Sequence, residues 1–406
     1  MAGIVLSDRQ RLDWLRLIRS ESVGPRTFRS LMNRFGGAAA ALDALPELAR
    51  QAGRSVRLCP LVDAEREFES LRRLGGSLIA LGEASYPLPL QAIDSAPPLI
   101  AVLGRADALL RPSVALVGSR NASAAGQKFT ARLARDLGEA GFVIVSGLAR
   151  GIDTAAHEAS VASGSVAVLA GGLDEVYPPQ NLPLLRRMLE EGAAISEMPL
   201  GWKPRGRDFP RRNRLVSGLS LGTVVVEAAR KSGSLITARF ANEQGRQVFA
   251  VPGSPLDPRA EGGNHLIREG ATLCAEAAHV IEALEPLLRG GHDFRQLPLV
   301  MSEGVREDAS QTLWDELDLP GVPAAPSAPL PEPQLGMEPP ALVDGADGEA
   351  VRALVMRLLG AAPVSVDELV RASGRSAREI NHTVFELELD GVILRHPGGA
   401  LTRIAP

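Results

Sequence analysis

The spacing of hydrophobic positions changes along this chain and divides it into parts. Over residues 8–75 apolar side chains recur at helical intervals, and Val23-Gly24-Pro25 interrupts them. This pattern predicts a small helical domain over residues 1–78. A helix, a Val-Gly-Pro turn and a second helix resemble a helix-hairpin-helix, whose backbone amides can bind a phosphate. Because no basic cluster accompanies this turn, a tight turn in a small helical bundle is the favoured interpretation.

Short apolar runs alternate with amphipathic segments from residue 110 to residue 287. The runs predict buried strands at Val114–Val117, Phe142–Val145, Val166–Leu169, Ala194–Ser196, Thr223–Val226 and Gln247–Val251. Amphipathic stretches predict helices near 123–140, 151–163, 179–191 and 234–244. Apolar strands that alternate with helices form parallel sheets covered on both faces. We therefore expect an α/β domain with a Rossmann-like, doubly wound, mostly parallel sheet over residues 79–290.

The pattern changes again after residue 290. Residues 291–347 read as an acidic, proline-rich linker, with eight prolines between residues 320 and 340. Residues 348–406 then predict a helix near 349–359, a second near 376–389 and a hairpin over 392–404, an arrangement that resembles a winged helix. The second helix offers cations to DNA but also three glutamates, so contact with a protein or a structural role is an equal alternative.

Composition favours a protein of the cytoplasm. No apolar run approaches the ~20 residues that cross a bilayer, and the first residues lack a secretory signal. Cys59 and Cys274 have no Cys or His partner at metal spacing, so we expect free thiols and no metal site.

The charges are unevenly distributed along the chain, although the net charge is only −4. Residues 201–260 carry eleven Lys and Arg against four acids, whereas residues 301–350 carry eleven acids and one Arg. Such a basic region attracts phosphates.

Four segments at or after predicted strands combine glycine or small polar residues with cations. They are Gly118-Ser119-Arg120, Ser146-Gly147-Leu148-Ala149-Arg150-Gly151, Phe209-Pro210-Arg211-Arg212-Asn213-Arg214 and Lys231-Ser232-Gly233-Ser234. Backbone N–H groups in such turns, at the positive end of a helix, bind anions, and a guanidinium can hold a phosphate at two points. Because loops at the carboxyl ends of parallel strands meet at one edge, we expect a groove that binds successive phosphates.

The aromatic ring of Phe209 would let this groove hold a base as well as its phosphates, since stacking contributes roughly 1–3 kcal/mol per base. A solvated basic helix start is the alternative interpretation of this segment.

The fingerprint Gly-x-Gly-x-x-Gly followed by an acid is absent, so we expect no dinucleotide cofactor. For Tyr177 and Asn181, in the loop after the third strand, the sequence does not separate a structural role from a functional one.

The ordered series of motifs resembles the DNA-processing protein A family, DprA or Smf. The resemblance rests on the segments named above and on Gly171–Asn181, Ser196-Glu197-x-Pro199, Ser232-Gly233-Ser234-x-x-Thr237-Ala238, Val251-Pro252-Gly253 and Gly263–Ala271. It implies an extended Rossmann fold between a helical domain, of SAM or helix-hairpin-helix type, and a winged helix. It also implies a homodimer without catalysis that binds and protects single-stranded DNA and loads the RecA recombinase during natural transformation.

The resemblance also implies where the DNA lies. Arg120 would hold a phosphate beside the amides of Gly147 and Gly151, and Phe209 would pack beside a base. The predicted binding residues are Gly118, Ser119, Arg120, Gly147, Gly151, Phe209, Arg211, Arg212, Asn213, Arg214, Lys231, Ser232, Gly233 and Ser234.

Two other functions fit parts of the sequence. Related Rossmann-like folds hydrolyse nucleoside monophosphates with a phosphate-binding turn and a carboxylate, and Glu227, which precedes the turn at Gly233, could be that carboxylate. No second acid or histidine stands at a compelling spacing. Alternatively, the winged helix could make the protein a sequence-specific DNA-binding regulator.

Overall fold

A computed structural model gives the fold. It describes residues 4–289 and, farther along the chain, 351–356, 369–370, 373, 375–390, 392–395 and 401–403. The chain forms two compact units, Met1–Pro323 and Ala324–Pro406, and each is described by itself. The acidic, proline-rich segment predicted as a linker lies outside the described residues.

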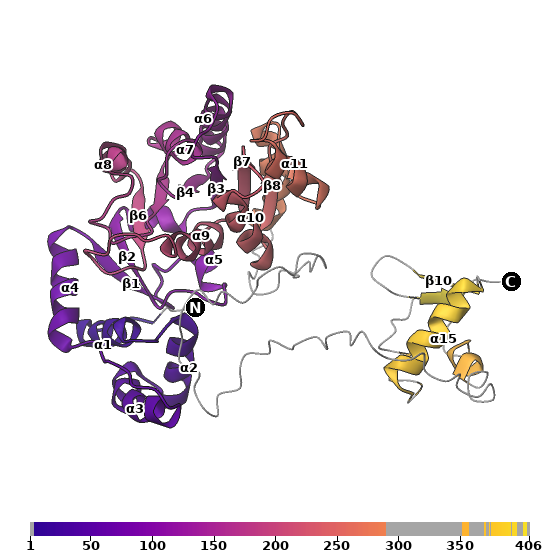
Figure 1. The fold of residues 1–406 in the computed structure, drawn as a ribbon, viewed down its shortest axis with the longest axis horizontal. Helices are drawn as coiled ribbons and strands as arrows, with labels where there is room; N and C mark the ends of the chain where they lie inside the picture. The colour runs from indigo at the N-terminus through magenta and orange to yellow at the C-terminus, as the bar shows by residue number, and fades with distance from the viewer. Residues whose placement is uncertain are drawn as a thin grey trace. The chain divides into compact units, whose positions relative to one another are not determined.

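Four helices open the first unit, as the helical spacing predicted: α1 (Asp8–Arg19), α2 (Pro25–Phe35), α3 (Ala38–Gln51) and α4 (Leu61–Arg73) (Figure 1). A capping box begins α1, because Ser7 and Gln10 satisfy each other's backbone N–H groups. Helix α2 begins with Pro25 at its first position, and Gly36, whose φ of 72° is left-handed, caps its end. The predicted Val-Gly-Pro turn therefore separates two helices.

A sheet of nine strands follows, in the order β1-β2-β6-β5-β4-β3-β7-β8-β9. Strands β3 to β9 run parallel to one another, whereas β1 and β2 pair antiparallel, and β2 is antiparallel to β6. The strands are β1 (Ser77–Ala80), β2 (Leu99–Gly104), β3 (Ser113–Gly118), β4 (Val143–Ser146), β5 (Ser165–Val168), β6 (Ala193–Ser196), β7 (Gly222–Val226), β8 (Gln247–Ala250) and β9 (Thr272–Leu273).

All six predicted strands are present, which confirms the mostly parallel α/β fold. The hydrophobic pattern did not predict strands β1, β2 and β9. Strand β9 has only two residues, and β1 and β2 precede the region where apolar runs alternate with helical segments. They extend the Rossmann-like sheet at both edges.

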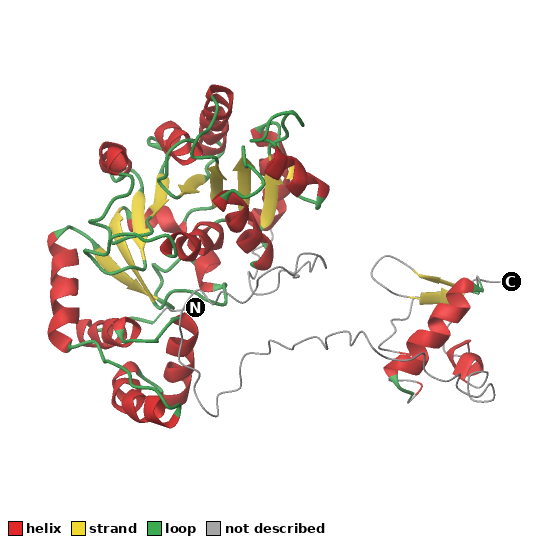
Figure 2. Ribbon diagram, in the orientation of Figure 1, coloured by secondary structure: helices red, strands yellow, loops and turns green. Residues whose placement is uncertain are grey.

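Helices cover both faces of the sheet (Figure 2). The helices of this part are α5 (Leu88–Gln91), α6 (Ala124–Glu139), α7 (Ile152–Ser160), α8 (Leu182–Met188), α9 (Asp208–Leu219), α10 (Gly233–Glu243), α11 (Glu261–Arg268) and α12 (Ala277–Arg289), with short 3-10 turns η1 (Ala106–Leu110) and η2 (Pro179–Asn181). Alternate residues of β3 separate the two faces: Ala115 and Val117 share a core with α9, whereas Val114 and Leu116 share one with α6 and α12. The sheet is therefore doubly wound.

The order of the strands reverses at β3. The chain passes from β3 through β4 and β5 to β6 on one side, then returns to place β7, β8 and β9 on the other. Gly118 at the end of β3 lies opposite Val226 at the end of β7, and a Cβ at Gly118 would come within 1.8 Å of the Val226 carbonyl oxygen. Only glycine allows this approach. The loops after β3 and β7 therefore emerge side by side, at the switch point where such sheets bind ligands.

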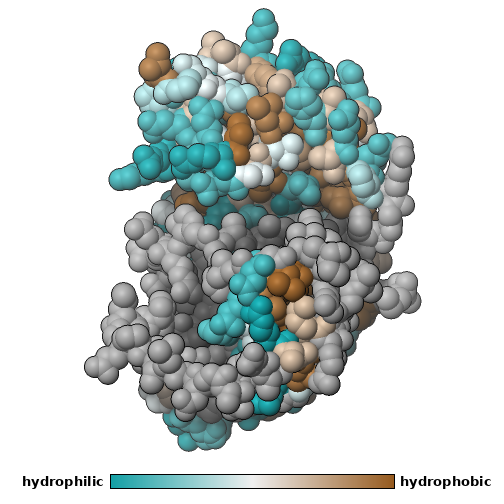
Figure 3. Space-filling view, turned by 90° about the vertical axis from the view of Figure 1, so that its right-hand side faces the viewer, coloured by the Kyte–Doolittle hydropathy of each residue, from teal (hydrophilic) through white to brown (hydrophobic). Residues whose placement is uncertain are grey.

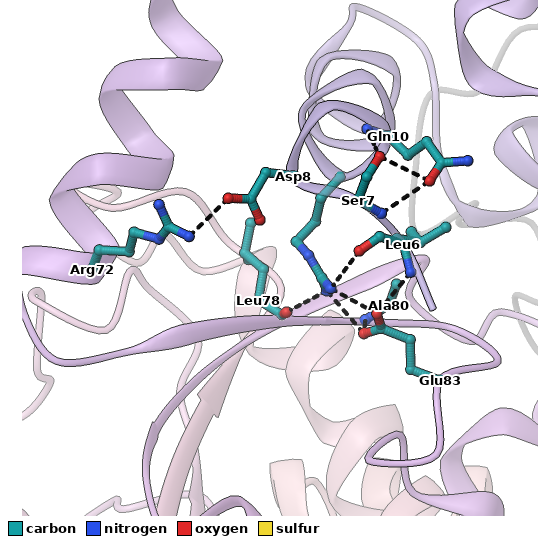
Figure 4. Close-up of polar contacts among 9 residues, drawn as sticks. Leu6, Ser7, Asp8, Gln10, Arg72, Leu78, Ala80 and Glu83 are labelled. Atoms are coloured by element: carbon teal, nitrogen blue, oxygen red, sulfur yellow. Dashed lines mark hydrogen bonds and ion pairs between the residues drawn. The ribbon is translucent and has the colours of Figure 1, made fainter. Parts of the chain in front are cut away.

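A partly buried ion pair fixes helix α1 to the strand layer (Figure 4). The Arg11 guanidinium donates to both oxygens of Glu83, at 2.8 and 2.7 Å, and to the Leu78 carbonyl at 2.8 Å. Glu83 also accepts from the amides of Ala80 and Leu6. Burial opposes the ionisation of Glu83, but the hydrogen bonds from Arg11 and from these amides outweigh it, so that the pKa of this carboxyl is lowered.

The second unit contains α15 (Ala377–Leu389) and a hairpin of β10 (Ile393–Arg395) and β11 (Leu401–Arg403). Ser376 and Glu379 form a capping box at the start of α15. Val355, Ile380 and Leu387 form a buried core with both strands of the hairpin. The predicted second helix and hairpin of the winged helix are confirmed.

Among the described residues of the chain, every helix is too short or too polar to span a bilayer.

The Arg11–Glu83 pair provides a test of how the helical domain is held. We expect Glu83→Gln to lower the free energy of unfolding by about 1.5–3 kcal/mol at pH 7, the range for hydrogen bonds to charged groups. Because the folded-state pKa is lowered, this stabilisation is present above the unfolded pKa of about 4.3 and disappears as the pH falls through the folded value. Urea unfolding at pH 7 and below pH 4 measures both effects.

The control for that comparison is Glu65→Gln, at an exposed position of α4. It should change the free energy of unfolding by less than about 0.5 kcal/mol. Equal losses for the two variants, or a Glu83→Gln loss that does not change with pH, would show that the ion pair does not hold the domain.

Candidate nucleic-acid interface

The loop after β3 presents an exposed cation at the switch point. Arg120 is exposed, and its guanidinium carbon lies 5.1 Å from the centre of the Phe209 ring. Ser119 is held in place, because its carbonyl oxygen accepts from the amide of Ile152 at 3.2 Å and its hydroxyl accepts from the amide of Asn121. The structure therefore brings Arg120 and Phe209, which lie far apart in sequence, into a cation–π contact.

The loop after β4 packs against the loop after β3. Gly151 has a φ of 75°, and a Cβ there would come within 2.3 Å of the Ser119 carbonyl oxygen. The carboxylate of Asp153 accepts from the amides of Gly147 and Ala149, both at 3.2 Å. The amide of Gly147, expected to face a phosphate, is therefore bonded within the protein, whereas Gly151 begins α7 at the junction of the two loops.

Arg212 lies beneath this loop. Its side chain is 5% exposed, and its guanidinium occupies the space that a side chain of Gly147 would need, since a Cβ there would lie 1.5 Å from Nη1. The same nitrogen donates to the Val168 carbonyl at 3.0 Å. Burial lowers the pKa of Arg212 to about 10, and the charge of Asp153 opposes that shift. Arg212 therefore supports the loop from within, where we had expected it to line the open pocket.

Arg214 also faces inward. It is 1% exposed, forms an ion pair with the Glu197 carboxylate and donates to the Ser95 carbonyl. The Glu197 carbonyl in turn accepts from Arg19 of helix α1 at 3.0 Å, and Arg19 pairs with Glu67 of α4. Through Glu197, helix α9 is tied to the end of β6 and to the helical domain.

A helix separates the residues that the sequence analysis treated as one basic cluster. Phe209, Arg211 and Asn213 are half-buried on α9, whereas Arg212 and Arg214 turn into the protein. These residues therefore do not all line one accessible pocket as expected, because successive side chains of a helix point in different directions. The apolar residues Leu215, Val216 and Leu219, which follow in the sequence, indicate that α9 packs on the core.

The turn before α10 completes the edge. Ser232 caps the helix by accepting from the amide of Ser234 at 3.3 Å, and the two hydroxyls lie 2.7 Å apart. Lys231 and Gly233 are exposed, whereas Ser234 is buried. Asn213 donates its side-chain amide to the Gly233 carbonyl at 3.2 Å, which joins this turn to α9. The turn and the aromatic end of α9 therefore belong to one surface.

Glu227, the carboxylate of the hydrolase alternative, is engaged in the fold. It accepts from both the amide and the hydroxyl of Ser123, the residue that caps α6. Its backbone φ of 50° is unusual for a non-glycine residue, and a Cβ on Gly126 would come within 2.6 Å of its carboxylate. Both oxygens of Glu227 thus hold the start of α6, which does not favour a role as a general base.

The charges at this edge are distributed unevenly. The acids Asp153, Glu197 and Glu227 each accept hydrogen bonds from the protein's own loops and helices. Among the described residues, no acid lies within ion-pair distance of Arg120 or Lys231, which are both exposed. These two cations therefore have no ion-pair partner among the described residues. The sequence did not show that these acids face inward, although Asp153 lies in the first turn of a helix and Glu197 and Glu227 lie directly after strands.

Three segments of the chain match known sequence families. Residues 77–285 match the family described as DNA recombination-mediator protein A, residues 8–70 the DprA-like N-terminal HHH domain, and residues 324–399 the DprA winged helix domain. The matches follow the order predicted for the helical, α/β and winged-helix parts.

Curated proteins and a solved structure agree with these matches. The chain is 34% identical to protein Smf of Synechocystis, over 78% of this chain and 77% of that protein. It is 36% identical to protein Smf of Escherichia coli, over 79% and 76%. The X-ray structure of DNA processing protein A from Streptococcus pneumoniae superposes with a TM-score of 0.58 at 30% identity, covering 69% of this chain and 98% of that one. This chain belongs to the DNA recombination-mediator protein A family, DprA or Smf.

Proposed function

We propose that this protein binds single-stranded DNA along the carboxyl edge of its parallel sheet. One observation carries the proposal: exposed Arg120 lies over the ring of Phe209 at the switch point, with no acid of the described residues to neutralise it. A cation beside an aromatic ring offers attraction for a phosphate and a surface for its base. Unpaired bases are accessible to such a ring, whereas bases stacked in a duplex are not.

The predicted residues divide into two groups under this proposal. Those at the surface would contact the DNA, and they are Ser119, Arg120, Gly151, Phe209, Arg211, Asn213, Lys231, Ser232 and Gly233. The others hold the surface in shape: Gly118 and Gly147 allow close packing, Arg212 and Arg214 position α9, and Ser234 donates its amide to the capping residue of α10. Backbone and charge contacts of this kind do not distinguish sequences. Binding should therefore depend on strand length and salt more than on sequence.

The family resemblance extends the proposal to a pathway and to partners. We propose that the bound strand is protected and passed to the RecA recombinase in natural transformation, and that the protein acts as a homodimer. The edge strand β9 supports the dimer, because no strand of the described residues pairs with its outer side and Leu273 on it is 43% exposed. Figure 3 shows apolar side chains among hydrophilic ones on the side where α11 and β8 lie in Figure 1.

Arg120→Ala tests the DNA-binding surface. The variant should bind oligo(dT) roughly tenfold or more weakly at low salt, because a charge-assisted hydrogen bond contributes about 1.5–3 kcal/mol. The slope of log K against log salt should become shallower by about 0.7, the value for one phosphate contact on a single strand. Fluorescence anisotropy over a salt series measures both quantities. Arg186→Ala, at an exposed position of α8, is the control and should change neither.

Removal of residues 340–406 separates this proposal from a regulator that reads DNA with its winged helix. The shortened protein should keep most of its affinity for single-stranded DNA, because the proposed contacts lie between residues 119 and 233. A gel-shift comparison of single-stranded DNA, duplex and mononucleotide tests this. Loss of all DNA binding would favour the winged helix as the binding module.

Leu273→Arg tests the dimer. A charge on the exposed edge strand should prevent two copies from pairing there, so light scattering should report a monomer. Val62→Arg is the matched control, because Val62 is 57% exposed on the distant helix α4. A dimer that survives Leu273→Arg would place the interface elsewhere.

A further inference from the structure

Three aromatic residues differ in what covers their rings: Tyr177 in the loop after β5, Trp202 in the loop after β6 and Phe209 in the first turn of α9. The guanidinium of Arg120 lies over Phe209. The guanidinium of Arg205 lies 4.8 Å from the ring of Trp202, whose Nε1 donates to Asp208 at 2.9 Å. Tyr177 meets only the ring of Phe209, among the ring and cation contacts of the described residues, at 5.8 Å between centroids and 67° between planes.

Tyr177 is therefore the open ring of the three. Its side chain is 53% exposed, and no described residue forms a hydrogen bond with its hydroxyl. A tyrosine that serves the core buries its ring and satisfies its hydroxyl, as Tyr86 does by donating to the Pro97 carbonyl. Tyr177 does neither, so packing within this chain does not explain its position.

The loop that carries Tyr177 is held on both sides. Downstream, the side-chain amide of Asn181 donates to the carbonyls of Leu148 and Ala149, at 2.9 and 3.3 Å. Upstream, the amide of Gly172 donates to the Trp202 carbonyl at 3.0 Å. These bonds fix the loop to the β4–α7 loop and to the loop before α9. Tyr177 thus lies on a loop that is already fixed, so that less conformational entropy is lost when a ligand binds.

From this arrangement we propose that Tyr177 stacks on a base of the bound single strand, next to the nucleotide held at Arg120 and Phe209. The proposal rests on the proposed single-stranded DNA binding and adds a second base contact to it. An edge-to-face pair of rings 5.8 Å apart can contact neighbouring bases of one strand. Stacking requires only a π face, so this contact is made with any base and carries no sequence preference.

A comparison of two ligands isolates the stacking. We would measure the affinities of wild type, Tyr177→Ala and Tyr177→Phe for oligo(dT) and for an oligomer of equal length in which abasic sites replace the bases. Tyr177→Ala should bind oligo(dT) about 5- to 150-fold more weakly, the range for loss of one stacked base. Tyr177→Phe should bind like wild type, because it keeps the ring. All three proteins should bind the abasic oligomer equally, and their salt slopes should agree.

Other outcomes overturn the inference in distinct ways. An unchanged affinity of Tyr177→Ala for oligo(dT) means that the ring contacts no base. An equal loss on the abasic oligomer means that Tyr177 acts through the backbone or through the shape of its loop. If wild type binds oligo(dT) no better than it binds thymidine monophosphate, the proposed function fails as well. Equal melting temperatures of wild type and Tyr177→Ala would show that the exposed ring is not needed for folding.

Discussion

The inward-facing arginines of helix α9 are the interaction on which the rest of the interface depends. Arg212 fills the space under Gly147 and donates to β5, and Arg214 pairs with Glu197 at the end of β6. Charges buried in this way are costly unless they are paired and hydrogen-bonded, so each fixes α9 to one place on the sheet. With α9 fixed, its first turn presents Phe209 to Arg120. The contact between Phe209 and Arg120 is thus a consequence of how these buried arginines place α9.

The same principle organises the acids. Asp153 holds the β4–α7 loop, Glu197 joins β6 to α9 and to helix α1, and Glu227 holds the start of α6. Each of these carboxylates is held within the fold, and no acid of the described residues lies within ion-pair distance of the exposed cations Arg120 and Lys231. A chain with a net charge of −4 can therefore still expose unpaired cations at one edge. The distribution of charge matters here, and the total does not.

Much of this protein followed from its sequence. The six parallel strands, the helices between them and the hairpin of the second unit could be predicted because their apolar spacing matches the period of each element. The edge of the sheet where the loops gather also followed, since parallel strands end on one side. Gly118 and Gly151 stood out in the sequence as turn residues. The structure shows that the carbonyl oxygens of Val226 and Ser119 lie where their side chains would be.

Tertiary structure alone decided which way each side chain faces. The sequence placed Arg211, Arg212, Asn213 and Arg214 in one basic run, but a helix that packs on the core turns two of these arginines inward. It also could not reveal that Tyr177 and Phe209 touch, because a ring contact between loops depends on how β5, β6 and α9 are placed. Local periodicity determines elements, whereas the partners of a buried charge or an exposed ring are set by segments distant in the chain.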